Sequence, residues 1–322
     1  LTAAGAATIT GGNGGGTADI GPLSGSAPLT IAQTSTFDLA GDISTYSGTL
    51  FFTGNGQIRL NENVTGSEQA TFDLAGTTNL AKRTTIDTVT LGALRGIAGT
   101  TLQGSTGGGN TSATTYVIGD NGLSTTFAGS IVNGGGPPAI TKRGSGALTL
   151  TGAGSYTGAT LVSAGELIVN GSLGNTAVTV AGGAKLRGAG TIGGTVTAQP
   201  GAQISPGAAT LLAGTLTTGA GLSFNGATLS MQLAGTPAGD NDKVVMTGGT
   251  LALSGTTTLT TNLTDGVLGA GIYELITGGT ATTGGVANLA WTPPASARQS
   301  FALSAPPGKL LLTVTGDPAT LR

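Results

Sequence analysis

The sequence predicts an all-β protein folded as a parallel β-helix, a β-solenoid with coils of about 18–19 residues and irregular terminal caps. Three observations predict this fold: apolar residues recur at a nearly constant spacing, the recurring segments alternate apolar residues with Thr or Ser, and Gly residues bound them. A fixed period of about 20 residues is typical of a repeat architecture, and the alternation indicates strands with one buried face.

Two interleaved series carry the period. In the first, the spacings between successive markers are 19, 19, 18 and 18, and the markers are Leu148, Leu167, Leu186, Ile204 and Leu222. In the second, the spacings are 17, 18 and 20, and the markers are Leu161, Val178, Val196 and Leu216. Two series with one period predict two short strands per coil, each stacked about 4.8 Å above its predecessor.

The rest of the chain continues the strand pattern less regularly. The hexapeptide Thr36–Gly41 recurs unchanged at Thr71–Gly76, a spacing of 35, which predicts equivalent positions two coils apart. Longer apolar runs follow residue 240, as expected near a terminal cap. We therefore divide the chain into an N-terminal region of irregular coils (1–140), regular solenoid repeats (141–240) and a C-terminal β-strand cap region (241–322). Strands are also expected at 88–91, 115–119, 243–246, 250–254, 271–276 and 309–314.

The composition excludes several classes of function. The 322 residues include 61 Gly and 58 Thr but no His and no Cys, so Ser-His-Asp and Cys-His catalysis and His or Cys metal sites are excluded. A net charge of -2, with basic residues scattered along the chain, argues against nucleic acid as a partner. Every long uncharged stretch is interrupted by Gly, Thr or Pro, so we expect no membrane span.

Residues 142–170 carry a more specific pattern. Lys142-Arg143, the Gly146-to-Gly152 run with Leu148 and Leu150, Tyr156, and the Gly165-to-Asn170 run lie in order along this segment. In this pattern the chain resembles the autotransporter-associated β-strand repeat, also called the passenger-associated transport repeat. The resemblance extends over about residues 120–275 and more loosely before them. It implies a right-handed parallel β-helix in a bacterial protein outside the cell, and it implies no activity.

The acidic residues suggest two candidate sites. Asp240 and Asp242, with Asn241 between them, could ligate Ca²⁺, although the ligand spacing of an EF-hand is missing and a solvated turn is favoured. Asp38 and Asp73 could form a carboxylate ladder near Asp42, but their place in an identical hexapeptide favours a repeated structural role.

The basic and aromatic residues suggest glycan contacts only weakly. Three basic clusters could bind an acidic polysaccharide if they shared one face, although solvated surface pairs are favoured: Lys82-Arg83, Lys142-Arg143 and Lys185 with Arg187. The sizeable ring surfaces are expected to fill the core or the caps: Tyr46, Phe51-Phe52, Tyr156 and Trp291. The Gly strings at 11–16 and 107–109 are read as loops, and four sequons begin at Asn63, Asn110, Asn170 and Asn262.

These observations favour an extracellular structural protein over an enzyme, with no catalytic residue, metal or cofactor. We expect a β-solenoid subunit that associates with copies of itself end to end into a surface fibre, sheath or matrix, with Thr8–Thr10 as a candidate donor strand. The alternative is a passenger or adhesin stalk that binds a glycan or a cell surface.

Overall fold

A computed structural model describes residues 1–11, 18–61, 64–83, 88–106, 111–207, 213–296 and 298–316. The chain forms two compact units, one of residues 1–167 with 171–176 and one of residues 168–170 with 177–322. Both are built from short, mostly parallel strands, and η1 (Val286–Asn288) is a single 3₁₀ turn. The predicted all-β parallel β-helix is confirmed. The boundaries at residues 140 and 240 stay predictions.

In each unit the chain passes through three strand positions per coil, which we call first, second and third. The sequence predicted two. The third strands were missed because several are only two residues long, such as β20 (Ser172–Leu173) and β23 (Thr191–Ile192), too short to show an alternation. Gly residues allow the sharp corners between positions: Gly144 and Gly183, for example, have φ of 67° and 81°.

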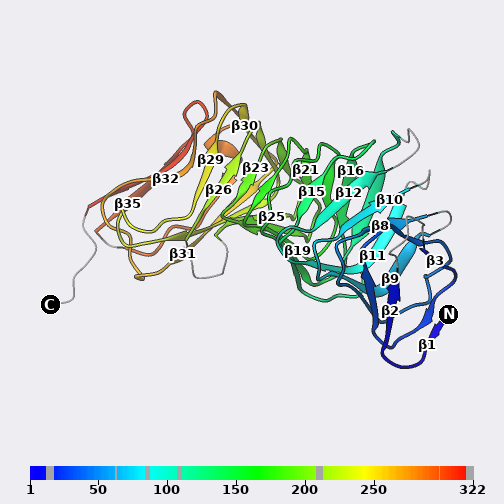
Figure 1. Cartoon of the computed structure of the whole chain (residues 1–322). Helices are drawn as coiled ribbons and strands as arrows, with labels where there is room; N and C mark the ends of the chain where they lie inside the picture. The colour runs from blue at the N-terminus through cyan, green and yellow to red at the C-terminus, as the bar shows by residue number, and fades with distance from the viewer. Residues whose placement is uncertain are drawn as a thin grey trace. The chain divides into compact units, whose positions relative to one another are not determined.

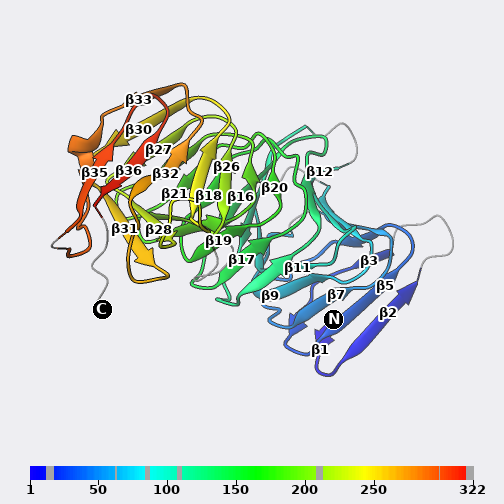
Figure 2. The same ribbon diagram turned by 90° about the vertical axis from the view of Figure 1, so that its left-hand side faces the viewer.

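In the first unit, parallel strands stack at all three positions (Figure 2). The first strands are β1 (Thr2–Ala3), β4 (Ser24–Gly25), β13 (Thr114–Ile118), β16 (Pro138–Lys142) and β18 (Thr160–Val162). The second strands are β2 (Ala7–Gly11), β5 (Leu29–Gln33), β7 (Thr49–Phe52), β14 (Thr125–Phe127) and β17 (Ala147–Leu150). The third strands are β3 (Ala18–Ile20), β6 (Phe37–Leu39), β8 (Gln57–Leu60), β10 (Asn79–Lys82), β12 (Thr101–Ser105), β15 (Ser130–Val132) and β20.

Two long strands of the first unit serve two positions at once. β9 (Gly66–Leu74) and β11 (Thr88–Gly96) pair with each other in two stretches separated by a register shift. The first stretch of β11 also pairs with β13, and the last residue of β11 pairs with β14. These strands therefore turn the corner between the first and second positions without a loop. β19 (Glu166–Val169) has residues in both units.

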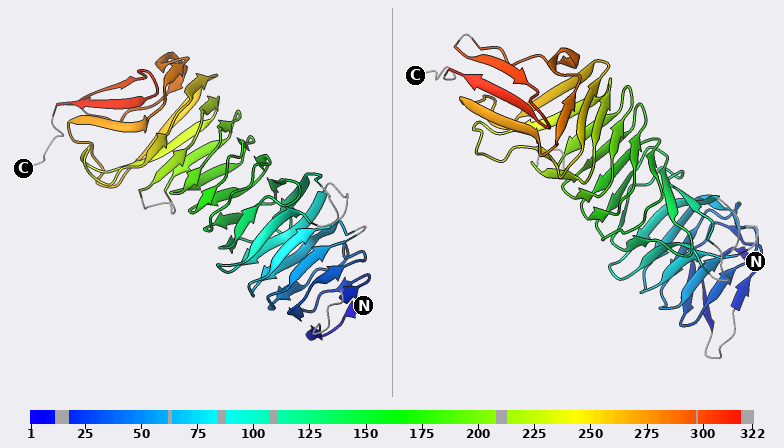
Figure 3. Two further views of the ribbon diagram at one scale, coloured as in Figure 1. Left: turned by 45° about the horizontal axis from the view of Figure 1, so that its top comes forward. Right: turned by 90° about the horizontal axis from the view of Figure 1, so that it is seen from above.

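The second unit repeats the three positions and ends in a hairpin (Figure 1). The first strands are β21 (Val178–Val180), β24 (Val196–Ala198), β27 (Leu222–Asn225), β30 (Thr250–Ser254) and β33 (Ala281–Thr283). The second strands are β22 (Lys185–Gly188), β25 (Gln203–Pro206), β28 (Thr228–Leu233), β31 (Thr257–Leu263) and β34 (Leu289–Ala290). The third strands are β23, β26 (Thr215–Thr218), β29 (Lys243–Met246) and β32 (Gly271–Thr277). β36 (Leu310–Thr315) and β35 (Ser300–Ser304) extend the third sheet in antiparallel order (Figure 3).

The predicted period is confirmed in one coil and not in the coil that follows it. Leu186 pairs with Ile204 and Val178 with Val196, a spacing of 18 in both series. The next partners are Leu229 for Ile204 and Leu222 for Val196, which lengthens the spacing to 25 and 26. Leu216 lies on a third strand and pairs with Val244, so its assignment to the second series was wrong.

Inward-facing apolar side chains form the core of each unit. Ile31, Phe52 and Phe72 are fully buried on second strands of the first unit, and the rings of Phe52 and Phe72 stack with centroids 6.4 Å apart. Leu186, Ile204, Leu229 and Leu259 fill the equivalent line in the second unit. Each such side chain contributes about 1.5–3 kcal/mol on burial, whichever large apolar residue it is. Keeping the spacing of the inward positions therefore matters more than keeping the same residue at each of them.

Candidate functional site

The side chains of the acidic loop before β29 form hydrogen bonds to backbone groups of the protein. The Asp242 side chain is buried, and its oxygens accept the N–H of Gly214 at 2.9 Å and of Gln232 at 2.7 Å. Asn241 donates to the carbonyls of Thr236, Pro237 and Gly239, while its Oδ1 accepts the N–H of Ala234. Asp240 is exposed. The two carboxylates therefore do not converge on a shared point where Ca²⁺ could bind.

Burial changes the acidity of this loop. It raises the pKa of Asp242 to about 6, against the lowering effect of the Gln232 and Gly214 N–H groups and of the Arg187 charge. At low pH the Asp242 carboxyl group is protonated and neutral, so it does not attract a cation. Within the described part of the chain, no three Asp or Glu side chains gather as a metal site would need.

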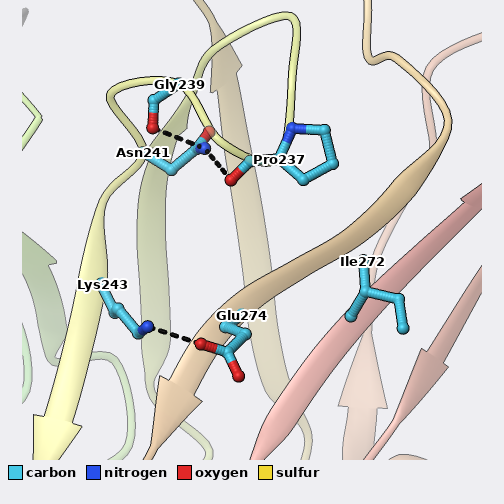
Figure 4. Close-up of a pocket in the computed structure, with 6 residues that line it drawn as sticks. All are labelled: Pro237, Gly239, Asn241, Lys243, Ile272 and Glu274. Carbon is cyan, nitrogen blue, oxygen red and sulfur yellow. Dashed lines mark hydrogen bonds and ion pairs between the residues drawn. The ribbon is translucent and has the colours of Figure 1, made fainter.

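A shallow pocket of about 310 Å³ lies beside the same loop (Figure 4). Lys243 and Glu274 face each other across it, with Nζ 2.6 Å from Oε2, and Ile272 is exposed at its side. The Lys243 ammonium lowers the pKa of Glu274, so this acid stays ionised near neutral pH. With its cation and anion paired to each other, the pocket offers no free charge to a substrate.

Asp38 and Asp73 do not form the carboxylate ladder considered from the sequence. Asp38 lies on β6 at the third position, whereas Asp73 lies on β9 at the second, so the identical hexapeptides occupy different sheets. The inference that they are equivalent positions two coils apart was wrong. Burial raises the pKa of Asp73, partly offset by Arg95 on the next strand. Asp42 is exposed, and it accepts the N–H of Ser44 within a turn.

Asp38 instead anchors an ion network inside one sheet. Its buried carboxylate accepts from Arg59 at 2.5 and 2.9 Å, from Arg83 at 2.9 Å and from Asn61 at 3.3 Å. Arg59 is its direct neighbour on β8, and Arg83 follows β10 on the coil after that. Since all its acceptor sites face donors, this acid is a structural tie across three coils.

Two of the three basic clusters expected as surface pairs are not pairs on the surface. Lys82 and Lys142 are buried, with 0% and 1% of their surface exposed, while Arg83 and Arg143 are exposed. Lys185 is exposed and Arg187 partly so. The strand parity of Leu80-Ala-Lys82 and of Ile140-Thr-Lys142 places both lysines inward, a signal that was present in the sequence. The polybasic glycan face is therefore not formed by these clusters.

Lys142 closes a turn between two coils. Its ammonium donates to the carbonyls of Arg143 at 2.5 Å, Gly144 at 3.0 Å and Ala164 at 3.3 Å. Burial lowers the pKa of Lys142 to about 8, although Asp120 and Glu166 act in the opposite direction. The group thus supplies the donor for three partly buried backbone acceptors of the two turns.

Of the aromatic residues expected to fill the core or the caps, Tyr46, Phe52 and Tyr156 are buried in the core, whereas Phe51 is not. Tyr46 is buried and donates to the carbonyls of Ala27 and Thr49. Tyr156 lies 2.6 Å from Thr160, whose hydroxyl reaches Thr176 at 2.9 Å. Trp291 is partly buried. Phe51 is partly exposed on β7.

Of the remaining sequence signals, two sequons can be placed. Asn170 and Asn262 are exposed. Asn63, Asn110, the Gly string at 107–109 and nearly all of the string at 11–16 lie outside the described residues.

One family model matches the chain. It is the passenger-associated-transport-repeat, and it covers residues 140–169. The chain carries a passenger-associated transport repeat. No curated protein matches the sequence. The described residues contain no helix with the length and apolar character needed to cross a membrane.

The repeat supplies structural rather than reactive residues. The matched segment starts within β16 and ends with β19, and it contains the buried side chains of Lys142, Leu148, Tyr156 and Leu167. Each complete strand of the segment, β17, β18 and β19, turns two residues inward, and Tyr156 is buried between β17 and β18. The passenger-associated transport repeat is thus a unit of solenoid geometry in this chain.

Proposed function

We propose that this chain is a structural, non-enzymatic passenger-type protein of the bacterial cell surface or exterior, whose solenoids join end to end into a fibre, sheath or matrix. The passenger-associated transport repeat supports the passenger type and the location. The candidate acids and lysines support a structural role, because Asp38, Lys142 and Asp242 bond within the protein.

The observation that carries self-association is the lack of charge on two second strands with open edges, β2 and β31. β2 (Ala7–Gly11) pairs with β5 along one edge, and no described strand pairs with its other edge. β31 (Thr257–Leu263) pairs with β28 from Thr258 to Leu263 but with β34 at only two residues. Neither strand contains a charged residue or Pro, the usual protection of strand edges against pairing.

Sedimentation velocity of the purified chain over a range of concentrations, followed by electron microscopy of the largest species, tests this function. We expect the mean mass to grow with concentration and the largest species to be elongated. A constant monomer mass over the whole range would contradict self-association and would favour the stalk that presents a glycan-binding face.

A further inference from the structure

The open edge of β31 has a defined length and hydrogen-bond pattern. β34 pairs only with Thr257 and Thr258, so no described strand covers the edge from Leu259 to Leu263. Thr258 N–H donates to Ala227 and Thr264 N–H to Leu233, both toward β28. Because peptide groups alternate in direction along a strand, the N–H and C=O groups of Leu259, Thr261 and Leu263 point to the open edge.

The open edge of β2 has the complementary pattern. Ala7 N–H donates to Pro28, toward β5, so Thr8 and Thr10 direct their peptide groups away from β5. Ile9, between them, faces inward in register with the buried Ile31 and is itself partly exposed. β2 has five residues, and the uncovered edge of β31 also has five.

Trp291 stands beside the edge of β31. It directly follows β34, its indole N–H donates to Thr261 Oγ1 at 3.3 Å, and its ring meets Phe301 edge-on with centroids 6.0 Å apart. A pocket of about 330 Å³ separates residues 258–261 from residues 290–292 and has no ionisable side chain in its lining. This pocket leaves uncharged space along the strand edge, next to an aromatic ring.

We propose that the occupant of this edge is β2 of a second copy of the chain, added in parallel to β31 with Ile9 opposite Thr261. This proposal rests on the proposed end-to-end function and names its junction. In this register Thr10 N–H donates to the Thr261 carbonyl and Thr261 N–H donates to the Thr8 carbonyl. Both bonds follow the parallel ladder already present between β2 and β5, and β2 keeps all its bonds to β5.

The side chains agree with the same register. Ile9 would point to the inward side of β31, where Leu259 is buried, and would enter the pocket beside Trp291. The outward Thr8 and Thr10 would continue the rows of Thr260 and Asn262. No charge would be buried, so the junction avoids the desolvation cost that an ionic contact would carry.

Two Pro variants test the two edges separately. Thr10→Pro removes an N–H that points away from β5, and Leu263→Pro removes one that points away from β28, so neither breaks a bond within the chain. The matched controls Thr10→Val and Leu263→Val keep both N–H groups. We expect each Pro variant to raise the concentration for half-assembly at least about tenfold and each Val variant to leave it within about twofold.

Mixing the two Pro variants gives the sharpest readout. Each keeps one intact edge, so an equimolar mixture should form dimers and nothing longer, which also shows that both variants are folded. Trp291 is the only Trp of the chain, so its fluorescence reports this site alone. On assembly we expect its emission to move to shorter wavelength and its quenching by acrylamide to fall.

Different outcomes of these experiments would reject either the junction alone or the proposed function as well. If the unaltered chain stays monomeric, the proposed function and the junction both fail. If it assembles but neither Pro variant weakens assembly and Trp291 emission does not change, the junction is wrong while end-to-end association stands. Assembly blocked by Leu263→Pro but not by Thr10→Pro would also overturn the proposal, because another strand would then occupy the edge.

Discussion

Lys142 shows how a single residue can be misjudged from its type. A lysine next to an arginine suggests a basic surface, yet here its ammonium lies among three backbone carbonyls of two consecutive coils. The three hydrogen bonds are partly buried, and leaving such acceptors without a donor costs up to about 1–3 kcal/mol. The lysine is therefore part of the framework of the passenger-associated transport repeat.

Replacing Lys142 by Ala should therefore destabilise the fold strongly. We expect a loss of about 2–4 kcal/mol in the free energy of unfolding, because the carbonyls lose their donor and a cavity remains. Lys185→Ala is the matched control, since Lys185 is exposed on β22, and it should change stability by less than about 0.5 kcal/mol. Urea unfolding followed by circular dichroism measures both. Equal midpoints for the two variants would contradict the capping role.

Asp242 predicts a pH dependence of stability. Its pKa is raised to about 6 by burial, so between its ordinary pKa and pH 6 the folded chain binds a proton more tightly than the unfolded chain. This group should therefore make the protein more stable as the pH falls from about 7 to about 4.5.

The Asp242→Asn variant isolates that contribution, because an amide does not titrate. The difference in melting temperature between the unaltered chain and Asp242→Asn, measured at several pH values, removes the effect of the other acids. We expect this difference to grow in favour of the unaltered chain as the pH falls. A difference that shrinks toward acid would mean that the two N–H donors outweigh burial and lower the pKa instead.

At the scale of the element, strand existence was easier to predict than strand partnership. The runs at 243–246 and 250–254 are strands as expected, because inward and outward residues alternate within them. Partnership depends on the length of each coil, and the coil from Ile204 to its partner Leu229 is longer than the coil from Leu186 to Ile204. A spacing rule cannot recognise a longer corner, so Leu222 was assigned to the wrong strand position. The prediction that the two copies of the repeated hexapeptide are equivalent was wrong for the same reason, because it too relied on spacing alone.

The candidate sites were harder to predict than the fold. A side chain such as Asp38 looks free in sequence because its partners Arg59 and Arg83 are 21 and 45 residues away. Only the stacking of third strands brings them together. Strand parity did contain the signal for Lys82 and Lys142, and it outweighs the general preference of lysine for the surface when the flanking residues are buried.

Glycine corners can be tested as structural elements. Gly144 and Gly183 both have positive φ, but a Cβ on Gly144 would lie 1.9 Å from the carbonyl oxygen of Gly119, whereas a Cβ on Gly183 meets nothing within 4 Å. Gly183→Ala should cost about 1–2 kcal/mol from backbone strain alone. Gly144→Ala should cost at least about 1 kcal/mol more, since neighbouring coils must separate. Thermal unfolding of both variants decides this; equal losses would show that coil contact at Gly144 adds nothing.

At the scale of the whole molecule, the two edges of the proposed junction differ from each other. A contact between β2 and β31 is heterologous, because each copy contributes one edge and keeps the other free. Such contacts propagate into open filaments unless a rotation closes them into a ring. The same asymmetry explains why the mixed Pro variants should stop at dimers, whereas a symmetric contact between two β2 strands would be abolished by Thr10→Pro alone.

The chemistry of the junction predicts how assembly responds to salt. β2 and β31 carry no charge, and the pocket beside Trp291 has no ionisable lining, so screening has little to weaken. Raising NaCl from about 0.1 M to about 1 M shortens the screening length from about 10 to about 3 Å. We expect the half-assembly concentration, measured by light scattering, to change less than about twofold. Ammonium sulfate should lower it, because excluded salts favour apolar burial. If the half-assembly concentration instead rose about tenfold over this NaCl range, the contact would lie at charged residues such as Lys243, Glu274 and Lys309, which are outside the β2–β31 edge.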